Sequence, residues 1–543
     1  MNNSAFQFGI PENERVRGYA PGSEDRVQLK AEVERQSRET LDIPLIIDGR
    51  EVRTGRTVDV VMPCEHRHVL ARCHLAGERE VKLAMAAALR AKADWATLSW
   101  VERASIQLKA AELIAARYRH ALNAATMLGQ GKNACQAEID SACETVDFLR
   151  YNAYFASQIY ASQPRSSMDQ LNRMEYRPLE GFVFTVSPFN FTAIASNLNM
   201  AVTLMGNTAV WKPATTSLLS NHLLMRIYME AGLPPGVINF VPGRGAEVGG
   251  PVLESRELAG IHFTGSNPTF NGLWKGVAER LERYRSYPRL VGETGGKDFL
   301  FAHASAEPEA VAAAIVRGSF EYQGQKCSAP SRAYIPESLW PRVREALTDM
   351  LGRVRVGDVR DFRNFVNAVI DVPAFDRIMG EIEAARASSE VEVVFGGRGD
   401  KSVGCFIEPT VLRVSDPKHR TMQEEIFGPV VSVFVYEDGR FEETLRLCDE
   451  TSPYALTGAM FVRDRYAFVK ACRILRYAAG NFYINDKPTG AMVGLQPFGG
   501  SRASGTNDKA GGPLNLQRWI NPRAIKETFV PATRFEYPVM AEA

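Results

Sequence analysis

The sequence predicts an α/β protein with two domains built on parallel sheets, and three observations lead to this fold class. The chain has 543 residues, which is enough for two or three full hydrophobic cores. Short apolar strands alternate with helix-like segments over 181–292, and a second alternating region spans about 298–485. Strands joined by crossover helices run parallel, and such sheets bind ligands at the carboxyl ends of their strands.

Composition and charge exclude several classes of partner. Hydrophobic residues make up 45% of the chain, charged residues 23%, and 64 basic residues balance 63 acidic ones. This balance provides no field that attracts nucleic acid or a membrane surface, and no apolar run reaches membrane-spanning length. The eight cysteines include no CxxC pair. We expect a small-molecule substrate, no metal, and a cytoplasmic protein, or one in the mitochondrial matrix if it is a processed form.

The first 160 residues predict an arm, short strands and three helices. Residues 1–42 are polar and charged, which suits an arm rather than a domain, and residues 43–76 alternate like strands. Apolar residues then recur at three and four positions, which predicts helices over 78–95, 101–118 and about 134–156.

Short apolar strands follow, and each ends in residues suited to a dinucleotide. The strands are predicted at 181–186, 208–211, 237–241 and 260–263. Glycine and serine at helix N-termini leave backbone N–H groups free for phosphate, and four such ends in succession are hard to explain as turn chemistry alone. These motifs are Ser187 to Phe191, Lys212 to Thr215, Pro242 to Gly245, and Thr264 to Thr269.

Two stretches further along carry candidate catalytic groups. Cys327 is predicted to lie on a loop between a helix that ends near Tyr322 and a strand at 332–335. A thiolate is a strong nucleophile, but a lone cysteine is more often structural. Glu293 ends a strand-like run and is followed by glycines, so backbone or substrate can approach its carboxyl closely. Together the two stretches indicate a nucleophile and a base.

Glu293 and Cys327 resemble the general base and the nucleophile of the NAD(P)-dependent aldehyde dehydrogenase superfamily. Its motifs usually read Glu-Leu-Gly-Gly-Lys and Gly-Gln-x-Cys, and this chain departs only at Thr294. The resemblance implies that the Asn190 amide and the Cys327 backbone N–H stabilise the oxyanion of a thiohemiacetal. It also implies that Glu293 activates the water that hydrolyses a later thioester.

The same resemblance implies an NAD site, although the Rossmann glycine fingerprint is absent. Lys212 would contact the adenosine ribose, Ser187 would line the site, and Glu425 would bind the nicotinamide ribose beside Phe427. Thr215 stands where many NAD-preferring relatives carry a glutamate, and NAD remains the expected cofactor. The residues expected by the pyrophosphate are Gly265, Ser266, Asn267, Pro268 and Thr269.

Further motifs narrow the resemblance to the branch of the superfamily that oxidises L-glutamate γ-semialdehyde. The implied reaction converts this aldehyde, which forms from 1-pyrroline-5-carboxylate, to L-glutamate in proline catabolism. The motifs are Gly129 to Lys132, Asn481 to Lys487, Pro497 to Gly500, and Ser504 to Lys509.

Several residues are candidates for holding that substrate. Gly490 and Ala491 can offer backbone N–H groups, and Ser328 a hydroxyl, to the α-carboxylate. By resemblance Glu144 would face the substrate ammonium; spacing alone equally suits a solvated acidic stripe. The aromatic candidates for clamping the aliphatic chain, either of which could instead be plain core, are Phe189 and Phe498.

The resemblance also implies a β-hairpin oligomerisation arm. Residues 161–180 and 513–543 contain alternating, extended stretches that would add to the sheet of a neighbouring subunit, so we expect a homodimer or larger homo-oligomer; ordinary surface strands are the alternative. The other divisions that we expect are 1–160 with 181–292 as an NAD-binding domain with its arm, 293–485 as the catalytic domain, and 486–512 as a substrate anchor loop.

Three other functions stay open at this point. The first is a dehydrogenase for another small aldehyde such as succinate semialdehyde, which has no ammonium group. The second is a cofactor-free cysteine hydrolase, which needs a histidine base, and only His262 lies on one of the strand segments assigned to the site. The third is a catalytically silent scaffold, which the presence of Cys327, Glu293 and Asn190 disfavours.

Overall fold

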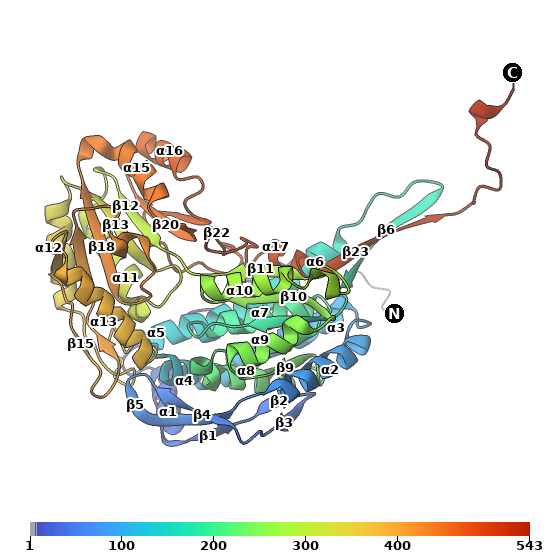
Figure 1. The fold of residues 1–543 in the computed structure, drawn as a ribbon, viewed down its shortest axis with the longest axis horizontal. Coiled ribbons are helices and arrows are strands. Elements are labelled where there is room, and N and C mark those ends of the chain that lie inside the picture. The colour runs from blue at the N-terminus through green and yellow to red at the C-terminus, as the bar shows by residue number, and fades with distance from the viewer. Residues whose placement is uncertain (1–5, 7, 543) are drawn as a thin grey trace.

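A computed structural model of the protein describes residue 6 and residues 8–542 and shows two α/β lobes with a projecting arm (Figure 1). Each lobe is built on a seven-stranded sheet. The predicted fold class of two α/β domains with parallel sheets is therefore confirmed. Within the described residues, none of the helices combines the length and the apolar character needed to cross a membrane.

The first lobe contains a sheet in the order β11-β10-β7-β8-β9-β2-β3. Strands β11 to β9 of this order pair in parallel, whereas β2 is antiparallel to both of its neighbours. The four predicted apolar strands are thus confirmed, with ends shifted by one or two residues. The bounds are β2 (Leu45–Ile47), β3 (Arg50–Val52), β7 (Phe182–Val186), β8 (Ala209–Lys212), β9 (Ile238–Phe240), β10 (Leu258–Thr264) and β11 (Arg289–Glu293).

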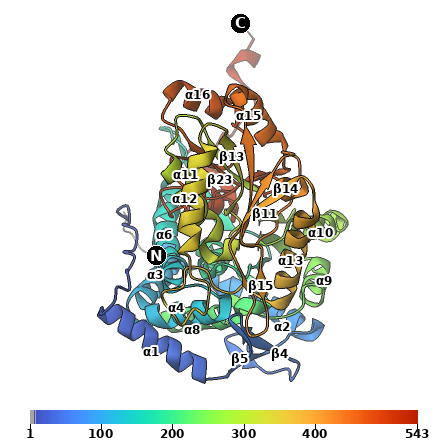
Figure 2. The same cartoon turned by 90° about the vertical axis from the view of Figure 1, so that its left-hand side faces the viewer.

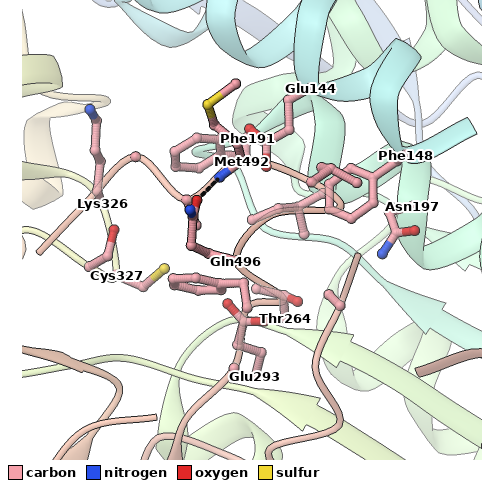
Figure 3. Close-up of a pocket in the computed structure, with 18 of the residues that line it drawn as sticks. Glu144, Phe148, Phe191, Asn197, Thr264, Glu293, Lys326, Cys327, Met492 and Gln496 are labelled. Atoms are coloured by element: carbon pink, nitrogen blue, oxygen red, sulfur yellow. Dashed lines mark hydrogen bonds between the residues drawn. The ribbon is translucent and has the colours of Figure 1, made fainter. Parts of the chain in front are cut away.

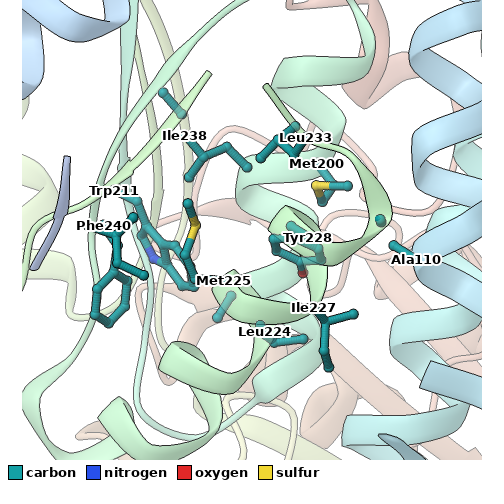
Figure 4. Packing of buried hydrophobic residues seen from close by; sticks show 14 of the residues in the cluster. Ala110, Met200, Trp211, Leu224, Met225, Ile227, Tyr228, Leu233, Ile238 and Phe240 are labelled. Carbon is teal, nitrogen blue, oxygen red and sulfur yellow. The ribbon is translucent and has the colours of Figure 1, made fainter. Parts of the chain in front are cut away.

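Helices cover both faces of this sheet, so its central strands are buried on both sides and read as continuous apolar runs. On one face Trp211 of β8 packs edge-on against Phe240 of β9, with ring centroids 5.2 Å apart, and Tyr228 lies in the same core (Figure 4). The helices are α2 (Glu78–Trp95), α3 (Trp100–Glu112), α4 (Arg119–Gln130), α5 (Ala134–Ala137), α6 (Thr145–Ala161), α7 (Thr192–Leu204), α8 (Leu218–Ala231), α9 (Gly245–Glu254) and α10 (Asn267–Ala278), with π-helical turns at Leu113–Tyr118 and Glu138–Glu144.

The N-terminal segment, which we expect to be an arm rather than a domain, contains a helix α1 (Glu24–Arg38) that the sequence analysis does not predict and that packs along α4 (Figure 2). Ser23 caps it by accepting from the Arg26 backbone N–H at 3.4 Å. Only three of its fifteen residues are buried, so its apolar periodicity is too sparse to read from sequence. Residues 1–5 and 7 lie outside the described part of the chain. The strands after it are β1 (Leu41–Ile43), β4 (Thr57–Met62) and β5 (Glu65–His74).

The second lobe contains the sheet β14-β17-β18-β13-β12-β20-β21, in which only the edge strand β14 is antiparallel to its neighbour. Its strands are β12 (Asp298–Ala302), β13 (Pro330–Pro336), β14 (Val391–Phe395), β17 (Thr410–Val414), β18 (Val430–Tyr436), β20 (Thr457–Phe461) and β21 (Asn481–Ile484). Its helices are α11 (Pro308–Phe320), α12 (Trp340–Gly352), α13 (Val372–Ala387), α14 (Arg420–Gln423), α15 (Phe441–Glu450) and α16 (Arg465–Ile474).

The remaining elements return the chain to the first lobe and form the arm. Strand β6 (Gln170–Pro178) pairs antiparallel with β23 (Ile520–Thr528), and this ribbon projects from the body with the C-terminal residues beyond it (Figure 1). The extended stretches that we predict within 161–180 and 513–543 are confirmed as strands, and they pair with each other within one chain. The other elements are β15 (Gly399–Asp400), β16 (Phe406–Ile407), β19 (Tyr454–Ala455), β22 (Ser501–Arg502) and α17 (Pro513–Gln517).

Candidate active site

A cavity of about 310 Å³ lies where the two lobes meet the loop at 486–512, and both Cys327 and Glu293 line it. Glu293 is the last residue of β11, and Cys327 lies on the loop between α11 and β13, as the sequence predicts. Figure 3 shows the Cys327 sulfur directed into the cavity, with Glu293 on one side of it and Glu144 on the other. The structure therefore brings the predicted nucleophile and base into one enclosed space.

The turn before the thiol has an unusual backbone. Tyr322 and Gln323 adopt the left-handed conformation, with φ of 53° and 55°, which is strained for residues other than glycine. The Gln323 side chain stabilises the turn because its Nε2 donates to the carbonyls of Gly131 at 2.9 Å and Ala368 at 2.8 Å. A side chain at Gly324 would lie 2.2 Å from the Gly428 carbonyl. Contacts from other elements thus fix the position of Cys327.

Cys327 is buried, with 9% of the residue's surface exposed. Burial raises the pKa of Cys327 well above its usual range, and the carboxylates of Glu293, Asp298 and Glu425 raise it further. Because the thiolate is the reactive form, the site must lose negative charge or transfer the thiol proton before Cys327 can attack a carbonyl carbon.

Glu293 has the properties of a general base that works near neutral pH. Burial raises its pKa to about 8, and the ammonium of Lys509 partly opposes this effect. Its Oε1 atom is buried and accepts no hydrogen bond from the described residues. A buried carboxyl without a protein partner is available to water or substrate in the cavity.

Asn190 lies beside the nucleophile loop. Its Nδ2 donates to the carbonyl of Gln325 at 3.0 Å, which ties the amide to the backbone two residues before Cys327. The amide has a second N–H, which can serve another acceptor. At this point the cavity wall is formed by the next residue, Phe191. The position of Asn190 is compatible with its predicted role as an oxyanion donor.

Most of the predicted substrate contacts line the cavity, namely Glu144, Ser328, Gly490, Ala491 and Phe498. Phe189 does not follow the prediction. It packs edge-on against Phe427, with centroids 5.8 Å apart, and Phe191 provides the aromatic wall instead. Phe189 and Phe191 both follow the end of β7 at Val186 and are two positions apart in the chain. The conformation of the loop after β7 therefore decides which of the two rings reaches the cavity.

Glu144 is the one member of its acidic helix face without a partner among the described residues. Asp140 forms an ion pair with Lys132 at 2.6 Å, and Asp147 accepts from the backbone N–H of Glu14 at 2.7 Å. Burial raises the pKa of Glu144 well above its usual range, and the charge of Asp140 adds to this effect. A cationic group in the cavity would therefore restore the charged form of Glu144.

The loop at 486–512 is fastened to the strand that carries the base. The Thr294 hydroxyl donates to the carbonyl of Ala503 at 2.5 Å, and the Gly292 N–H donates to the Thr506 hydroxyl at 2.9 Å. Thr294 is the residue that departs from the motif of the superfamily, and its hydroxyl makes a contact that leucine cannot make. Within this loop Gly490 has a φ of +96°, which favours glycine.

Sequence reasoning missed the contribution of the N-terminal segment to the cavity. Glu14 and Val16 line it, and the Glu14 carboxylate pairs with Arg119 and Arg150, each at 2.7 Å. These residues carry no local signal, because their role depends on contacts more than a hundred positions away. The other lining residues outside the prediction include Phe148, Asn197, Lys326, Lys487, Thr489 and Gln496.

The predicted dinucleotide residues follow the carboxyl ends of adjacent parallel strands of the first sheet. Ser187 accepts from the indole N–H of Trp211 at 2.9 Å, and the Lys212 ammonium donates to the Pro213 carbonyl at 3.1 Å. Burial lowers the pKa of Lys212. Thr215 begins a short 3₁₀ turn after this strand.

The expected pyrophosphate residues form the start of helix α10. Ser266 is its N-cap and accepts from the Thr269 N–H at 3.4 Å. Pro268 stands in the first turn, where a missing N–H costs nothing. At Gly265 an added Cβ would lie 2.8 Å from the ring of Phe263, so this position has no room for a side chain. Asn267 donates to the Ala503 carbonyl at 2.8 Å and also holds the loop at 486–512.

Glu425 lies at the lobe junction and presents a carboxylate suited to ribose hydroxyls. Its Oε1 accepts from the Gly296 N–H at 2.9 Å, and burial raises its pKa to about 7. An added Cβ at Gly295 would lie 2.0 Å from its other oxygen, so only glycine admits this side chain. Phe427 follows with a φ of 56°. A buried carboxylate, a lysine ammonium and a helix N-terminus fit the hydroxyls and phosphates of a dinucleotide.

Comparison with known proteins shows the family to which the chain belongs. The model of the aldehyde dehydrogenase family matches residues 51–525, and the chain belongs to this family.

Several of the similar proteins are named pyrroline-5-carboxylate dehydrogenases. The delta-1-pyrroline-5-carboxylate dehydrogenase of Dictyostelium discoideum is 51% identical over 98% of this chain and 96% of its own length. The Homo sapiens protein of that name is 47% identical over 97% and 94%. A crystal structure of the Mycobacterium tuberculosis enzyme, bound with NAD, matches with a TM-score of 0.96 at 50% identity, covering 100% of both chains.

Proposed function

We propose that this protein oxidises L-glutamate γ-semialdehyde, which forms from 1-pyrroline-5-carboxylate, to L-glutamate with NAD as the oxidant. The observation that carries the proposal is the cavity, in which a buried thiol and a buried carboxyl lie opposite the unpaired carboxyl of Glu144. Family membership supplies the reaction class. The names of the relatives support the choice of substrate.

The Cys327 thiol first loses its proton to water in the cavity, and the resulting thiolate attacks the aldehyde carbon. The carbonyl oxygen gains negative charge as the carbon–sulfur bond forms, and the Asn190 amide with the Cys327 backbone N–H would donate to it. Each such donor is worth roughly 3 kcal/mol, or about 100- to 1000-fold in rate. The proximity of Asn190 to the backbone of Gln325 keeps this donor close to the thiol loop.

Bound NAD supplies the hydride acceptor, and Lys212, Glu425 and the N-terminus of α10 are the groups that would hold it. After hydride loss, the substrate carbon remains on Cys327 as a thioester. Glu293 then takes a proton from water, the water oxygen attacks the thioester, and L-glutamate leaves as the thiol is restored. A general base of this kind contributes about 100- to 10,000-fold.

The ends of the substrate have separate partners in this proposal. Backbone N–H groups at Gly490 and Ala491, with the Ser328 hydroxyl, would bind the α-carboxylate. Ser328 is held by a hydrogen bond of 2.8 Å to Thr489, another lining residue. Glu144 would pair with the α-ammonium, which offsets the cost of keeping that carboxyl buried.

Succinate semialdehyde is the alternative substrate, and it lacks the ammonium that Glu144 would bind. The two readings are separated by NADH formation with a panel of aldehydes in the presence and absence of glutamate. We expect a much higher kcat/KM for glutamate γ-semialdehyde than for succinate semialdehyde, together with competitive inhibition by glutamate. A preference for succinate semialdehyde without such inhibition would refute the substrate assignment and leave the family membership intact.

We also propose a homodimer or larger homo-oligomer and a reducing compartment, the cytoplasm or the mitochondrial matrix. The projecting ribbon of β6 and β23 leaves backbone groups at its edges for a second copy. All eight cysteines, each of them within the described residues, are free. Sedimentation analysis tests the assembly, and a monomer at micromolar concentration would contradict it.

A further inference from the structure

The segment from Gly129 to Lys132 takes no part in the reaction described above, yet it contacts both sides of the site. The Gln130 side chain donates to the Thr192 hydroxyl at 2.9 Å, at the start of α7. The carbonyl of Gly131 accepts from Gln323, in the turn before the nucleophile, at 2.9 Å. The segment thus lies between the helix that follows Asn190 and the loop that carries Cys327.

Lys132 places a cation at this junction. Its side chain is 1% exposed, and its Nζ lies 2.6 Å from Asp140 Oδ2. The same ammonium lies 3.9 Å from the ring centroid of Phe191 and 4.5 Å from that of Tyr322. A desolvated cation over an aromatic face is attracted to it. One charge therefore contacts a carboxylate, the aromatic wall of the cavity and the strained turn of the thiol loop.

Asp140 supplies a cap that helix α7 does not have in its own sequence. The N-cap position is Phe191, whose side chain cannot accept a hydrogen bond. Asp140 Oδ2 accepts from the Thr192 N–H at 3.0 Å, and Oδ1 accepts from the Ala193 N–H at 2.8 Å. A carboxylate at a helix N-terminus also interacts favourably with the helix dipole.

We propose that the Lys132–Asp140 ion pair is a positioning device that fixes the start of α7 and with it Asn190 and Phe191. The inference rests on the proposed function only for the identity of the reaction that Asn190 assists. Two carboxylate oxygens are needed for two N–H donors, and an amide offers only one acceptor oxygen. Lys132 supplies the counter-charge that a carboxylate buried at this depth requires.

The test compares Lys132→Met, Asp140→Asn and the double variant, with hydrogen–deuterium exchange and stopped-flow NADH formation as readouts. In all three variants we expect faster exchange in the peptide that contains Thr192 and Ala193. We also expect the NADH burst to slow on the order of 10- to 100-fold, with KM changed less than about threefold, because small displacements of a catalytic group have effects of this size.

The double variant and a core variant separate an effect on the position of Asn190 from a general loss of protein stability. The double variant removes both charges, so its melting temperature should recover towards the parent value while the burst stays slow. Leu224→Ala, in the buried core of the first lobe, should lower the melting temperature and leave the burst rate unchanged. Recovery of the burst together with the melting temperature in the double variant, or unchanged exchange at the start of α7, would overturn the proposal.

The two proposals fail in different ways. The burst is measured with whichever aldehyde of the panel reacts, so rejection of glutamate γ-semialdehyde would refute the proposed substrate alone. The exchange measurement needs no substrate. Normal exchange over Thr192 and Ala193 in Asp140→Asn would refute the positioning role even in an enzyme whose substrate is confirmed.

Discussion

The ionisation of Glu293 should control the hydrolytic half of the reaction. With a pKa of about 8, close to one-tenth of the enzyme carries the carboxylate at pH 7 and about nine-tenths at pH 9. Hydrolysis of the thioester should therefore speed up about tenfold over this interval. Glu293→Gln removes the base, so the steady state should fall on the order of 100- to 10,000-fold while the NADH burst persists.

Stopped-flow absorbance of NADH over a pH series separates the two phases. The burst reports the formation of the thioester, and the steady state that follows reports its hydrolysis. A steady state that does not change between pH 7 and 9 would refute the argument. Equal loss of burst and steady state in Glu293→Gln would also refute it, because a base that acts after hydride transfer cannot slow the earlier step.

The same carboxyl affects stability. Its pKa in the folded protein lies above the usual value of 4.5, so ionisation opposes folding. The contribution of Glu293 to stability is therefore fully present below about pH 4.5 and is lost as the pH rises through about 8, by on the order of 5 kcal/mol at about 1.4 kcal/mol per pKa unit. Glu293→Gln should melt at a higher temperature than the parent at pH 9, with a smaller difference at pH 5.

Three further substitutions test individual groups. Cys327→Ala should abolish aldehyde oxidation and leave NAD affinity, measured by calorimetry, nearly unchanged; residual turnover would move the chemistry elsewhere. Ala491→Leu should fill the space for the α-carboxylate and raise KM for the semialdehyde about tenfold or more, with little effect on NAD. Glu144→Gln should raise that KM on the order of 10- to 100-fold and leave the KM for succinate semialdehyde unchanged; equal effects on both would exclude an ammonium contact.

Much of the fold follows from the sequence, because the four strands predicted at 181–186, 208–211, 237–241 and 260–263 are short apolar runs followed by turn residues. The helix Glu78–Trp95 forms over the predicted residues. Helix α1 was missed because it lies on the surface and buries few residues. Its place is decided by contacts with α4, which no local pattern encodes.

The site follows from the sequence only where a motif fixes the chemistry. Cys327 and Glu293 both line one cavity. Local patterns place Glu293 at the end of a strand and Cys327 on a loop, and only the resemblance of their motifs to the aldehyde dehydrogenase superfamily pairs them in one site. The choice between Phe189 and Phe191 depends on loop conformation, which local pattern does not decide. Glu14 is held at the cavity by ion pairs with Arg119 and Arg150, which are more than a hundred positions away in the chain. Such pairs form only in the folded chain, so no local pattern predicts them.

The covalent intermediate offers the most direct test of the account. Cys135 and Cys143 also line the cavity, so the site of acylation distinguishes the proposed nucleophile from two other thiols. Glu293→Gln is mixed with NAD and glutamate γ-semialdehyde, quenched in acid during the burst, digested and examined by mass spectrometry. The account predicts a glutamyl group on the peptide that contains Cys327 and on no other cysteine. A glutamyl group on Cys135 or Cys143, or an unmodified Cys327 after a full burst, would contradict it.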